Sequence, residues 1–263
     1  MYGLTLCAQD GVFAFTMSYL AVIREMPSVV GGHKLWIFAA ISVLFAAFGR
    51  LVRGVTSGGA IAGAAVCFAL LWGAGASGFA GLFAVFALTW LCTRAGYRRK
   101  EHLGTAEARS GRDAVQVLAN LGTAAACALI YAQFPNSWLF AAMAAALAEP
   151  AADTVSSEIG QAMGGVPRLV TNGRKVPHGT NGAITVIGTA AGACAAIIVA
   201  FVFFIFGDVG RFSFAAIALS GVVGMMADSL LGATIEGRAR LGNNAVNFIS
   251  TIVAAIVAFV IVL

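Results

Sequence analysis

The chain has 263 residues, of which 60% are hydrophobic and only 10% are charged, and its mean hydropathy is +0.92. A soluble domain carries roughly 25% charged and 45–50% apolar residues. This composition excludes a water-soluble globule, a disordered chain and a disulfide scaffold. It predicts an all-α polytopic membrane protein, a helix bundle whose 32 glycines allow close helix packing.

Hydrophobic runs separated by Gly, Pro and charged residues predict about nine membrane spans with short loops. In chain order these spans cover residues 3–23, 35–50, 57–73, 78–94, 113–134, 137–162, 180–206, 212–235 and 244–263. All nine belong to a single transmembrane domain over residues 1–263, with no room for a separate soluble domain.

The basic residues are concentrated in every second loop. Of the 16 Lys and Arg residues, 13 follow the second, fourth, sixth and eighth spans, and only Arg24, Lys34 and Arg211 fall on the other side. By the positive-inside rule the basic loops and the N-terminus are cytoplasmic. The net charge of +5 therefore indicates membrane topology, and we expect no nucleic-acid partner.

Acidic residues interrupt two of the apolar spans. An acid inside a span costs about 2.5–3.5 kcal/mol, so each needs a partner or a role. Carboxylates are ligands that Mg²⁺ prefers, so we expect this cofactor to be held by acids of the sixth and eighth spans: Glu149, Asp153, Glu158 and Asp228. The alternatives are interhelical hydrogen bonding and, for Glu158, contact with the cytoplasmic interface.

Three further groups have the chemistry of a phosphate site. The fifth span opens with Arg112, Asp113, Gln116 and Asn120, and the ninth opens with Asn243, Asn244 and Asn247. A Gly-rich loop before the seventh span, suited to binding an anion, contains Arg174, Lys175, Gly179, Thr180, Asn181 and Gly182. Helix capping is the alternative for Asp113, and capping with packing is the alternative for Asn243, Asn244 and Asn247. Gln116 and Asn120 could instead bond neighbouring spans, and topology alone is the alternative for Lys175.

Most of these groups lie at the cytoplasmic ends of their spans, and Asp153, Asp228, Asn120 and Asn247 lie one or two turns deeper. A transporter typically places its polar residues around the midplane of the membrane. A one-sided cluster of acids, amides and a basic loop instead indicates a site for Mg²⁺ and phosphates, which lipid can approach from the side.

The motifs GVTSGGAIAG, GRDAVQVLAN, ADTVSSEIG, RKVPHGTNGAITVIGT, ADSLLGATIE and NNAVNFIST occur in this order. This series resembles a widespread family of integral membrane proteins that includes phytyl-phosphate kinase of plants and cyanobacteria and an animal transmembrane homologue. The resemblance covers about residues 50–263, whereas residues 1–49 match less clearly. His178, at the variable position of the P-x-G-T-N-G stretch, is a minor departure from the residues expected there. The chain is also distantly similar to polyprenol kinases and CDP-diacylglycerol synthases.

The resemblance implies a Mg²⁺-dependent kinase that transfers a phosphoryl group from a nucleoside triphosphate, with CTP favoured, to an isoprenyl monophosphate. It implies catalytic roles for Asp153, Lys175 and Asp228. We expect a multi-pass protein of the plasma or inner membrane, with its active site facing the cytoplasm. The alternatives are a polyprenol kinase, a CDP-lipid cytidylyltransferase and, from another class, a transporter or flippase. The sequence leaves open whether the chain forms a homo-oligomer.

Overall fold

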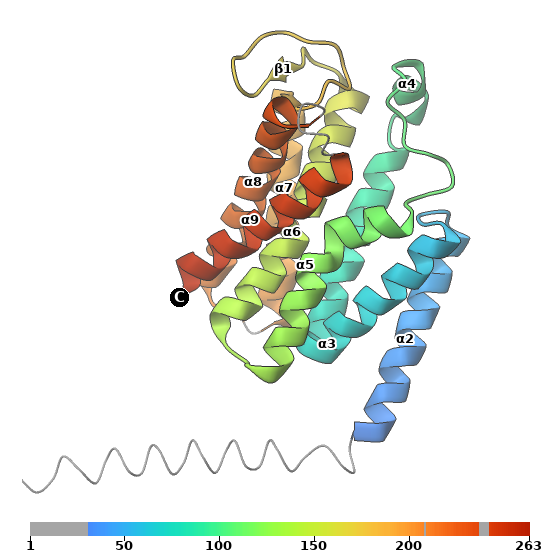
Figure 1. Ribbon diagram of the computed structural model, residues 1–263, viewed down its shortest axis with the longest axis vertical. Coiled ribbons are helices and arrows are strands. Elements are labelled where there is room, and N and C mark those ends of the chain that lie inside the picture. Colours follow the sequence, from blue (N-terminus) through green and yellow to red (C-terminus); the bar gives the residue numbers. More distant parts are fainter. Residues whose placement is uncertain (1–30, 208, 237–241) are drawn as a thin grey trace, which may run out of the picture. The chain divides into compact units, whose positions relative to one another are not determined.

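The computed structural model describes residues 31–207, 209–236 and 242–263, so the expected span over 3–23 lies outside the described residues. Residues Ser42 to Leu263 form one compact unit, and the chain before Ser42 belongs to a separate one. Helix α2 (Gly31–Leu51) begins in the first unit and ends in the second. The larger unit is a bundle of helices with one small sheet (Figure 1).

Helix α3 (Ser57–Arg94) contains both of the spans expected over 57–73 and 78–94. Its helical conformation breaks at Gly75, where φ is +58° and ψ is −136°, a region that glycine enters readily. Trp90 Nε1 donates to the carbonyl of Val52 at 3.1 Å, so the last turns of α3 lie beside the residues that precede it. The two expected spans are therefore antiparallel arms that meet at a glycine without an intervening loop (Figure 1).

Five of the remaining helices follow the expected spans closely, namely α5 (Ala114–Gln133), α6 (Ser137–Met163), α7 (Val186–Phe206), α8 (Arg211–Thr234) and α9 (Asn243–Val262). The short helix α4 (Tyr97–His102) lies in the loop between two expected spans and was not predicted. Side chains cap three of them, because Asp113, Asn136 and Thr185 accept hydrogen bonds from the first turns of α5, α6 and α7. The seventh span was expected from residue 180, but α7 begins later because strand β2 (Ala183–Ile184) pairs antiparallel with β1 (Arg168–Leu169).

Helix α6 lies at the centre of the bundle and contacts α3, α5, α7, α8 and α9. Every residue from Ala141 to Ala152 is buried. Among the described residues six helices are long and apolar enough to cross a membrane, namely α2, α3, α5, α7, α8 and α9. Helix α6 is not one of them, since its acids lower its hydropathy. The all-α polytopic fold is confirmed, whereas the count of nine spans and the orientation of the N-terminus stay predictions.

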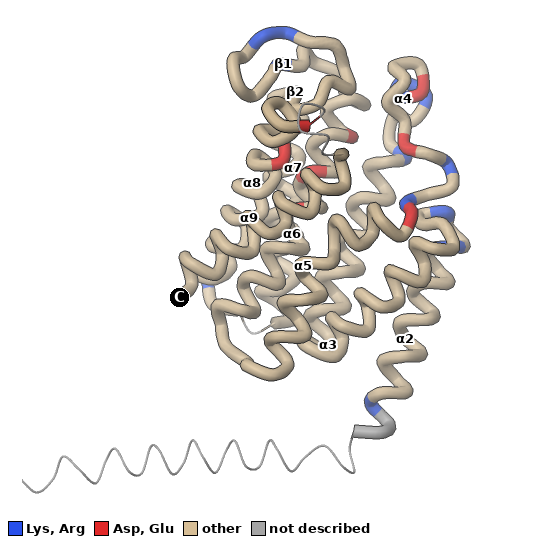
Figure 2. Tube along the Cα trace, viewed as in Figure 1, with Lys and Arg blue, Asp and Glu red and all other residues tan. Residues whose placement is uncertain are grey.

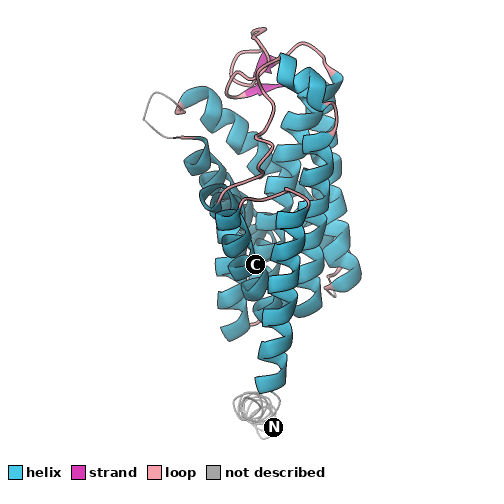
Figure 3. Ribbon diagram, turned by 90° about the vertical axis from the view of Figure 1, so that its right-hand side faces the viewer, coloured by secondary structure: helices cyan, strands magenta, loops and turns pink. Residues whose placement is uncertain are grey.

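Small residues bring the neighbouring helices close to α6. A Cβ atom added at Gly192 of α7 would lie 2.6 Å from the carbonyl oxygen of Ala152, and one added at Gly224 of α8 would lie 2.5 Å from Glu149 Cγ. These glycines therefore allow close backbone approach, as is typical of membrane helices. Figure 2 shows that many of the charged residues after Ser42 gather toward the end of the bundle that carries the sheet, and Figure 3 shows the same end from the side.

Candidate functional site

A polar cavity of ≈ 270 Å³ opens at this charged end, between α5, α6, α8, α9 and the loop that contains β1 and β2. It brings together residues that are distant in the sequence. The predicted site residues that line it are Arg112, Gln116, Asn120, Asp153, Glu158, Gly179, Thr180, Asn181, Gly182, Asp228, Asn243, Asn244 and Asn247. The structure therefore places most of the predicted constellation in one cavity.

Two acids face this cavity from different helices. Asp153 comes from α6 and Asp228 from α8. Asp228 is held in place by α9, since Ser250 Oγ donates to its Oδ2 at 3.3 Å and the Asn247 amide nitrogen donates to the same atom at 3.2 Å. The Asn247 side-chain oxygen in turn accepts from Asn120 Nδ2 at 3.3 Å. These contacts define the orientation of the Asn247 amide, because only in that orientation do its nitrogen face an acceptor and its oxygen face a donor. A chain of polar contacts thus links α5, α9 and α8 at the cavity.

Glu149 does not line the cavity. The residue is 1% exposed, and neither carboxylate oxygen has a hydrogen-bond partner among the described residues. It lies one helical turn before Asp153 on α6, packed against Gly224. A buried carboxylate without partners is costly, so Glu149 would need a proton or a cation beside it. Its predicted role as a metal ligand stays a prediction.

Glu158 lines the cavity but already has a cationic partner. The ammonium group of Lys100 forms a buried ion pair with Glu158 Oε2, and it also donates to the carbonyls of Cys92 at 3.1 Å and Thr93 at 2.7 Å. Lys100 therefore ties α4 and the end of α3 to α6. Because its charge is balanced by Lys100, Glu158 fits a structural role at the cavity wall better than the predicted role of metal ligand.

Arg112 is fixed on both its backbone and its side chain. Its N–H donates to the carbonyl of Gly54 at 3.0 Å, and its own carbonyl accepts from the N–H of Thr56 at 2.9 Å. Its guanidinium donates to Thr154 Oγ1 of α6 at 2.9 Å. The neighbouring Asp113 faces elsewhere, since it forms a capping box with Gln116 and does not line the cavity. Capping, the alternative considered for Asp113, is its role in this structure.

The Gly-rich loop reaches the cavity through residues 178–185. Gly182 has a φ of +71°, and a Cβ atom there would lie 2.4 Å from the carbonyl oxygen of Ser229, so this position packs directly on α8. Arg174 and Lys175 lie instead in the turn between β1 and β2, exposed and outside the cavity. The structure does not bring these two cations to Asp153, and their predicted contact with phosphate stays a prediction.

The oxygen-rich cavity can be judged by the ligands that Mg²⁺ requires. Among residues 31–207, 209–236 and 242–263 no group of three His, Cys, Asp or Glu side chains could hold a metal ion. Mg²⁺, however, usually keeps several waters and binds through one or two carboxylates together with substrate phosphates. Asp153 and Asp228 on one cavity meet that requirement. The residues therefore fit Mg²⁺ that arrives with a nucleotide better than a metal held by protein alone.

Several cavity residues were not predicted from the sequence. Glu107 lines the cavity from the loop after α4 and accepts from Gln116 Nε2 at 3.1 Å. His178, which was noted only as a departure from the family pattern, also lines it. Ser156 and Ser157 of α6 also line it, and for them helical spacing from Asp153 predicts a position on the same face, although no role was assigned to them. The run TVSSE was a signal for these serines, because it continues the acidic face of α6 by one turn.

Comparison with known proteins identifies the family. The profile described as "Integral membrane protein DUF92" matches residues 40–255. The chain belongs to this family. Its match covers every cavity-lining residue named above, and it confirms a multi-pass membrane protein and the resemblance carried by the sequence motifs.

Three relatives cover most of the chain. An uncharacterised membrane protein of Synechocystis is 36% identical over 198 residues, which cover 72% of this chain and 76% of the relative. An uncharacterised membrane protein of Methanocaldococcus jannaschii is 33% identical over 229 residues, which cover 87% of this chain and 94% of the relative. The chloroplastic protein VTE6 of Arabidopsis thaliana is 31% identical over 263 residues, which cover 95% of this chain and 79% of the relative. No solved structure matches the chain.

Proposed function

We propose that the chain is a membrane kinase that transfers the γ-phosphate of a nucleoside triphosphate, with CTP favoured, to an isoprenyl monophosphate. The observation that carries this proposal is the polar cavity, where Asp153, Asp228 and Arg112 meet a Gly-rich loop at the charged end of a membrane bundle. Membership of the DUF92 family and the likeness to VTE6 support it, since the sequence motifs resemble a family that includes phytyl-phosphate kinase.

The reaction joins two phosphate groups. An oxygen of the acceptor phosphate attacks the γ-phosphorus, and the bond from the γ-phosphorus to the oxygen that bridges it to the β-phosphate breaks. The products are an isoprenyl diphosphate and a nucleoside diphosphate. A phosphomonoester is largely ionised near pH 7, because its second pKa is about 6, so the nucleophile needs no general base. Catalysis then depends on positioning and on neutralising charge.

The cavity residues fit these two tasks. Asp153 and Asp228 would hold Mg²⁺, which when bound neutralises charge on the triphosphate. Arg112 would bind a phosphate oxygen, and the amides of Asn243 and Asn244 would orient the nucleotide. Residues Gly179 to Gly182 would donate backbone N–H groups to phosphate. A direct role for Lys175 requires the turn between β1 and β2 to approach the cavity when the nucleotide binds.

The orientation of the cavity completes the proposal. The basic loops predict that its end of the bundle faces the cytoplasm of the cell, at the plasma or inner membrane. A soluble nucleotide would then enter from the cytoplasm, while the lipid acceptor would arrive from within the membrane.

The test is a transfer assay with purified protein in nanodiscs, Mg²⁺, and a panel of prenyl alcohols and prenyl monophosphates. CTP labelled at the γ-phosphorus is expected to yield a labelled prenyl diphosphate, and CTP labelled at the α-phosphorus is expected to leave the lipid unlabelled. Asp153→Asn and Asp228→Asn should each lower the rate at least about 100-fold, as is typical when a charge-stabilising group is removed. Glu101→Gln, an exposed carboxylate outside the cavity, is the matched control.

The same assay separates the alternatives. Cytidine label in the lipid would identify a cytidylyltransferase, and phosphorylation of the alcohols alone would identify a polyprenol kinase. Absence of label from every lipid product would refute the kinase proposal, as would full activity of both aspartate variants.

A further inference from the structure

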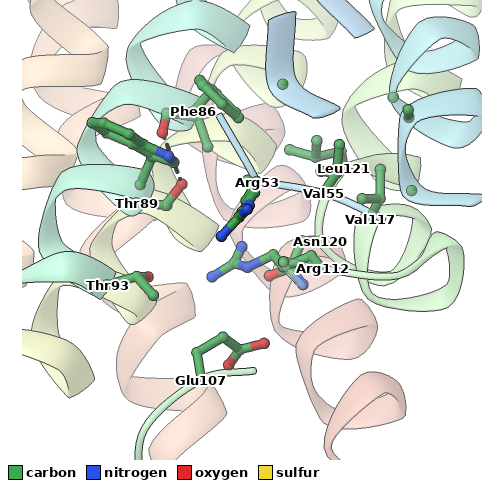
Figure 4. A pocket seen from close by; sticks show the side chains of 18 of the residues that line it. Arg53, Val55, Phe86, Thr89, Thr93, Glu107, Arg112, Val117, Asn120 and Leu121 are labelled. Atoms are coloured by element: carbon green, nitrogen blue, oxygen red, sulfur yellow. Dashed lines mark hydrogen bonds between the residues drawn. The ribbon is translucent and has the colours of Figure 1, made fainter. Parts of the chain in front are cut away.

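A second cavity, of ≈ 430 Å³, lies beside the polar one, between the end of α2, both arms of α3, α5 and the loop before α5. Its size falls in the range of small-molecule binding sites. Most of its wall is apolar, and it includes Phe45, Leu82, Val85, Phe86, Val117 and Leu121. Figure 4 shows that charged side chains also enter it.

Among the described residues that line this cavity are four arginines and one acid, Glu107. Arg94 is engaged with the Val52 carbonyl and with the ring of Trp90. Arg109 is paired with Glu101 at 3.0 Å. The other two arginines are Arg53 and Arg112, and no ion pair joins either of them to a carboxylate of the described residues.

Arg53 is unusual in a second respect. Its φ is +56°, and among the described residues it is the one non-glycine residue with a positive φ. Its guanidinium forms no hydrogen bond or ion pair with any described residue. Backbone strain of this kind persists where the surrounding structure enforces it, and it is common at ligand-binding sites. The conformation therefore suggests that the direction of this side chain matters for function.

Figure 4 shows the guanidinium groups of Arg53 and Arg112 pointing toward one another, with Glu107 on the far side of Arg112. The Glu107 carboxylate accepts from the amide of Gln116. Two cations that face one another repel unless an anion lies between them. Guanidinium groups bind phosphate oxygens in a planar, bidentate manner, so a phosphate suits this position.

The two cavities share part of their walls. Glu107, Arg112 and Asn120 line both of them. An anion between Arg53 and Arg112 would therefore lie next to the polar cavity that contains Asp153 and Asp228. The hydrophobic part of the second cavity extends from the same arginines along α3 and α5.

We propose that this second cavity binds the lipid acceptor, with an isoprenyl chain along the apolar wall and a phosphomonoester between Arg53 and Arg112. This placement rests on the proposed kinase function for the identity of the acceptor. It also specifies the substrate class, because a neutral prenyl alcohol would bring no negative charge to the two guanidinium groups. The acceptor phosphate would then approach the nucleotide across the wall that the two cavities share.

The test uses a farnesyl monophosphate probe with a diazirine on its chain, irradiated with the full-length protein in nanodiscs and followed by peptide mass spectrometry. Label is expected in α3 between Leu82 and Thr93 and in α5 between Val117 and Leu121. Unlabelled geranylgeranyl monophosphate should compete. Gly63→Leu should lower labelling at least tenfold, because a Cβ atom at Gly63 meets no atom within 4 Å and its side chain would fill the cavity.

Arg53 is tested separately from the apolar wall. Arg53→Gln should lower labelling by the monophosphate probe about tenfold, leave labelling by the matching farnesol probe unchanged, and raise the KM for the prenyl phosphate without changing the KM for CTP. Arg53→Gly removes the same charge and relieves the positive φ, so it replaces the glutamine variant if that protein does not fold. Arg50→Gln is the control, because Arg50 lies in the same segment, donates to Ser57 and does not line the cavity.

The outcomes distinguish the two proposals. Phosphoryl transfer with label only outside α3 and α5 would overturn this placement and leave the kinase function standing. Specific label in α3 and α5 without transfer from any nucleotide would support the lipid-phosphate site and refute the kinase function. An equal loss of labelling by both probes in Arg53→Gln would overturn the assignment of the phosphate to this arginine.

Discussion

Lys100 provides a direct test of how the cavity wall is held. Its side chain is fully buried, and Glu158 is 10% exposed. The ammonium group has three partners, the Glu158 carboxylate and the carbonyls of Cys92 and Thr93. Lys100→Met keeps the length of the side chain but leaves the Glu158 charge buried without its cation. Breaking a buried pair in this way costs about 3–5 kcal/mol.

A loss of this size raises the unfolding equilibrium constant by roughly 100- to 4,000-fold, since about 1.4 kcal/mol corresponds to a factor of ten. Glu158→Gln should be similarly costly, because it leaves the Lys100 charge uncompensated. The double variant Lys100→Met/Glu158→Gln removes both charges and should recover at least about 2 kcal/mol relative to the sum of the single changes.

The measurement is a double-mutant cycle of unfolding free energies in mixed micelles titrated with denaturing detergent. The exposed pair of Arg109 and Glu101 provides a control cycle, because its atoms are 3.0 Å apart but its side chains are 73% and 54% exposed. Solvent screening should make that coupling much smaller. If the losses of unfolding free energy in the two single variants are additive, or if their coupling is no larger than in the control cycle, the conclusion that this ion pair stabilises the packing of α4 on α6 is refuted.

Three further predictions concern the polar cavity and the segments that border it. Gly182→Ala should lower the melting temperature more than Gly173→Ala, because both residues have positive φ but only the Cβ at Gly182 would meet α8, and equal losses would contradict that contact. Asp113→Ala should lower the unfolding free energy by about 1 kcal/mol, because the N-terminal cap of α5 is lost. Asp113→Asn should retain most of the stability that the cap contributes, because asparagine is also a favoured capping residue. Removing Mg²⁺ with EDTA should abolish phosphoryl transfer, and added Mg²⁺ should restore it; transfer that persists in EDTA would exclude the proposed metal.

Much of this cavity could be predicted because a polar residue in a membrane span is costly and therefore indicates a partner or a functional role. The acids of α6 and α8 and the amides of α5 and α9 each lie a short distance from a helix end, and the alternation of basic loops indicates that these ends share one side. Asp153, Asp228 and Asn247 were grouped on that basis alone, and the structure places all three on one cavity.

The contacts between helices could not be predicted in the same way. Helical periodicity gives the depth and face of a residue, but it does not say which helix lies opposite. Lys100 was counted among the basic residues that indicate topology, although its partner Glu158 lies 58 residues later. The turn at Gly75 and the pairing of β2 with β1 likewise depend on backbone conformation and tertiary packing, which composition and hydropathy do not encode.

Arg112 also has a consequence for how two ligands would affect one another. Its guanidinium contributes to both cavities, and its backbone is bonded to the segment that follows Arg53. An anion that binds in one cavity therefore changes the electrostatic field in the other, and any shift of residues 54–56 displaces the same arginine. Because such coupling is thermodynamically reciprocal, the factor by which one ligand changes the affinity for the other must be the same in both directions. If both proposed ligands bind, the two cavities would thus behave as linked sites rather than as independent neighbours.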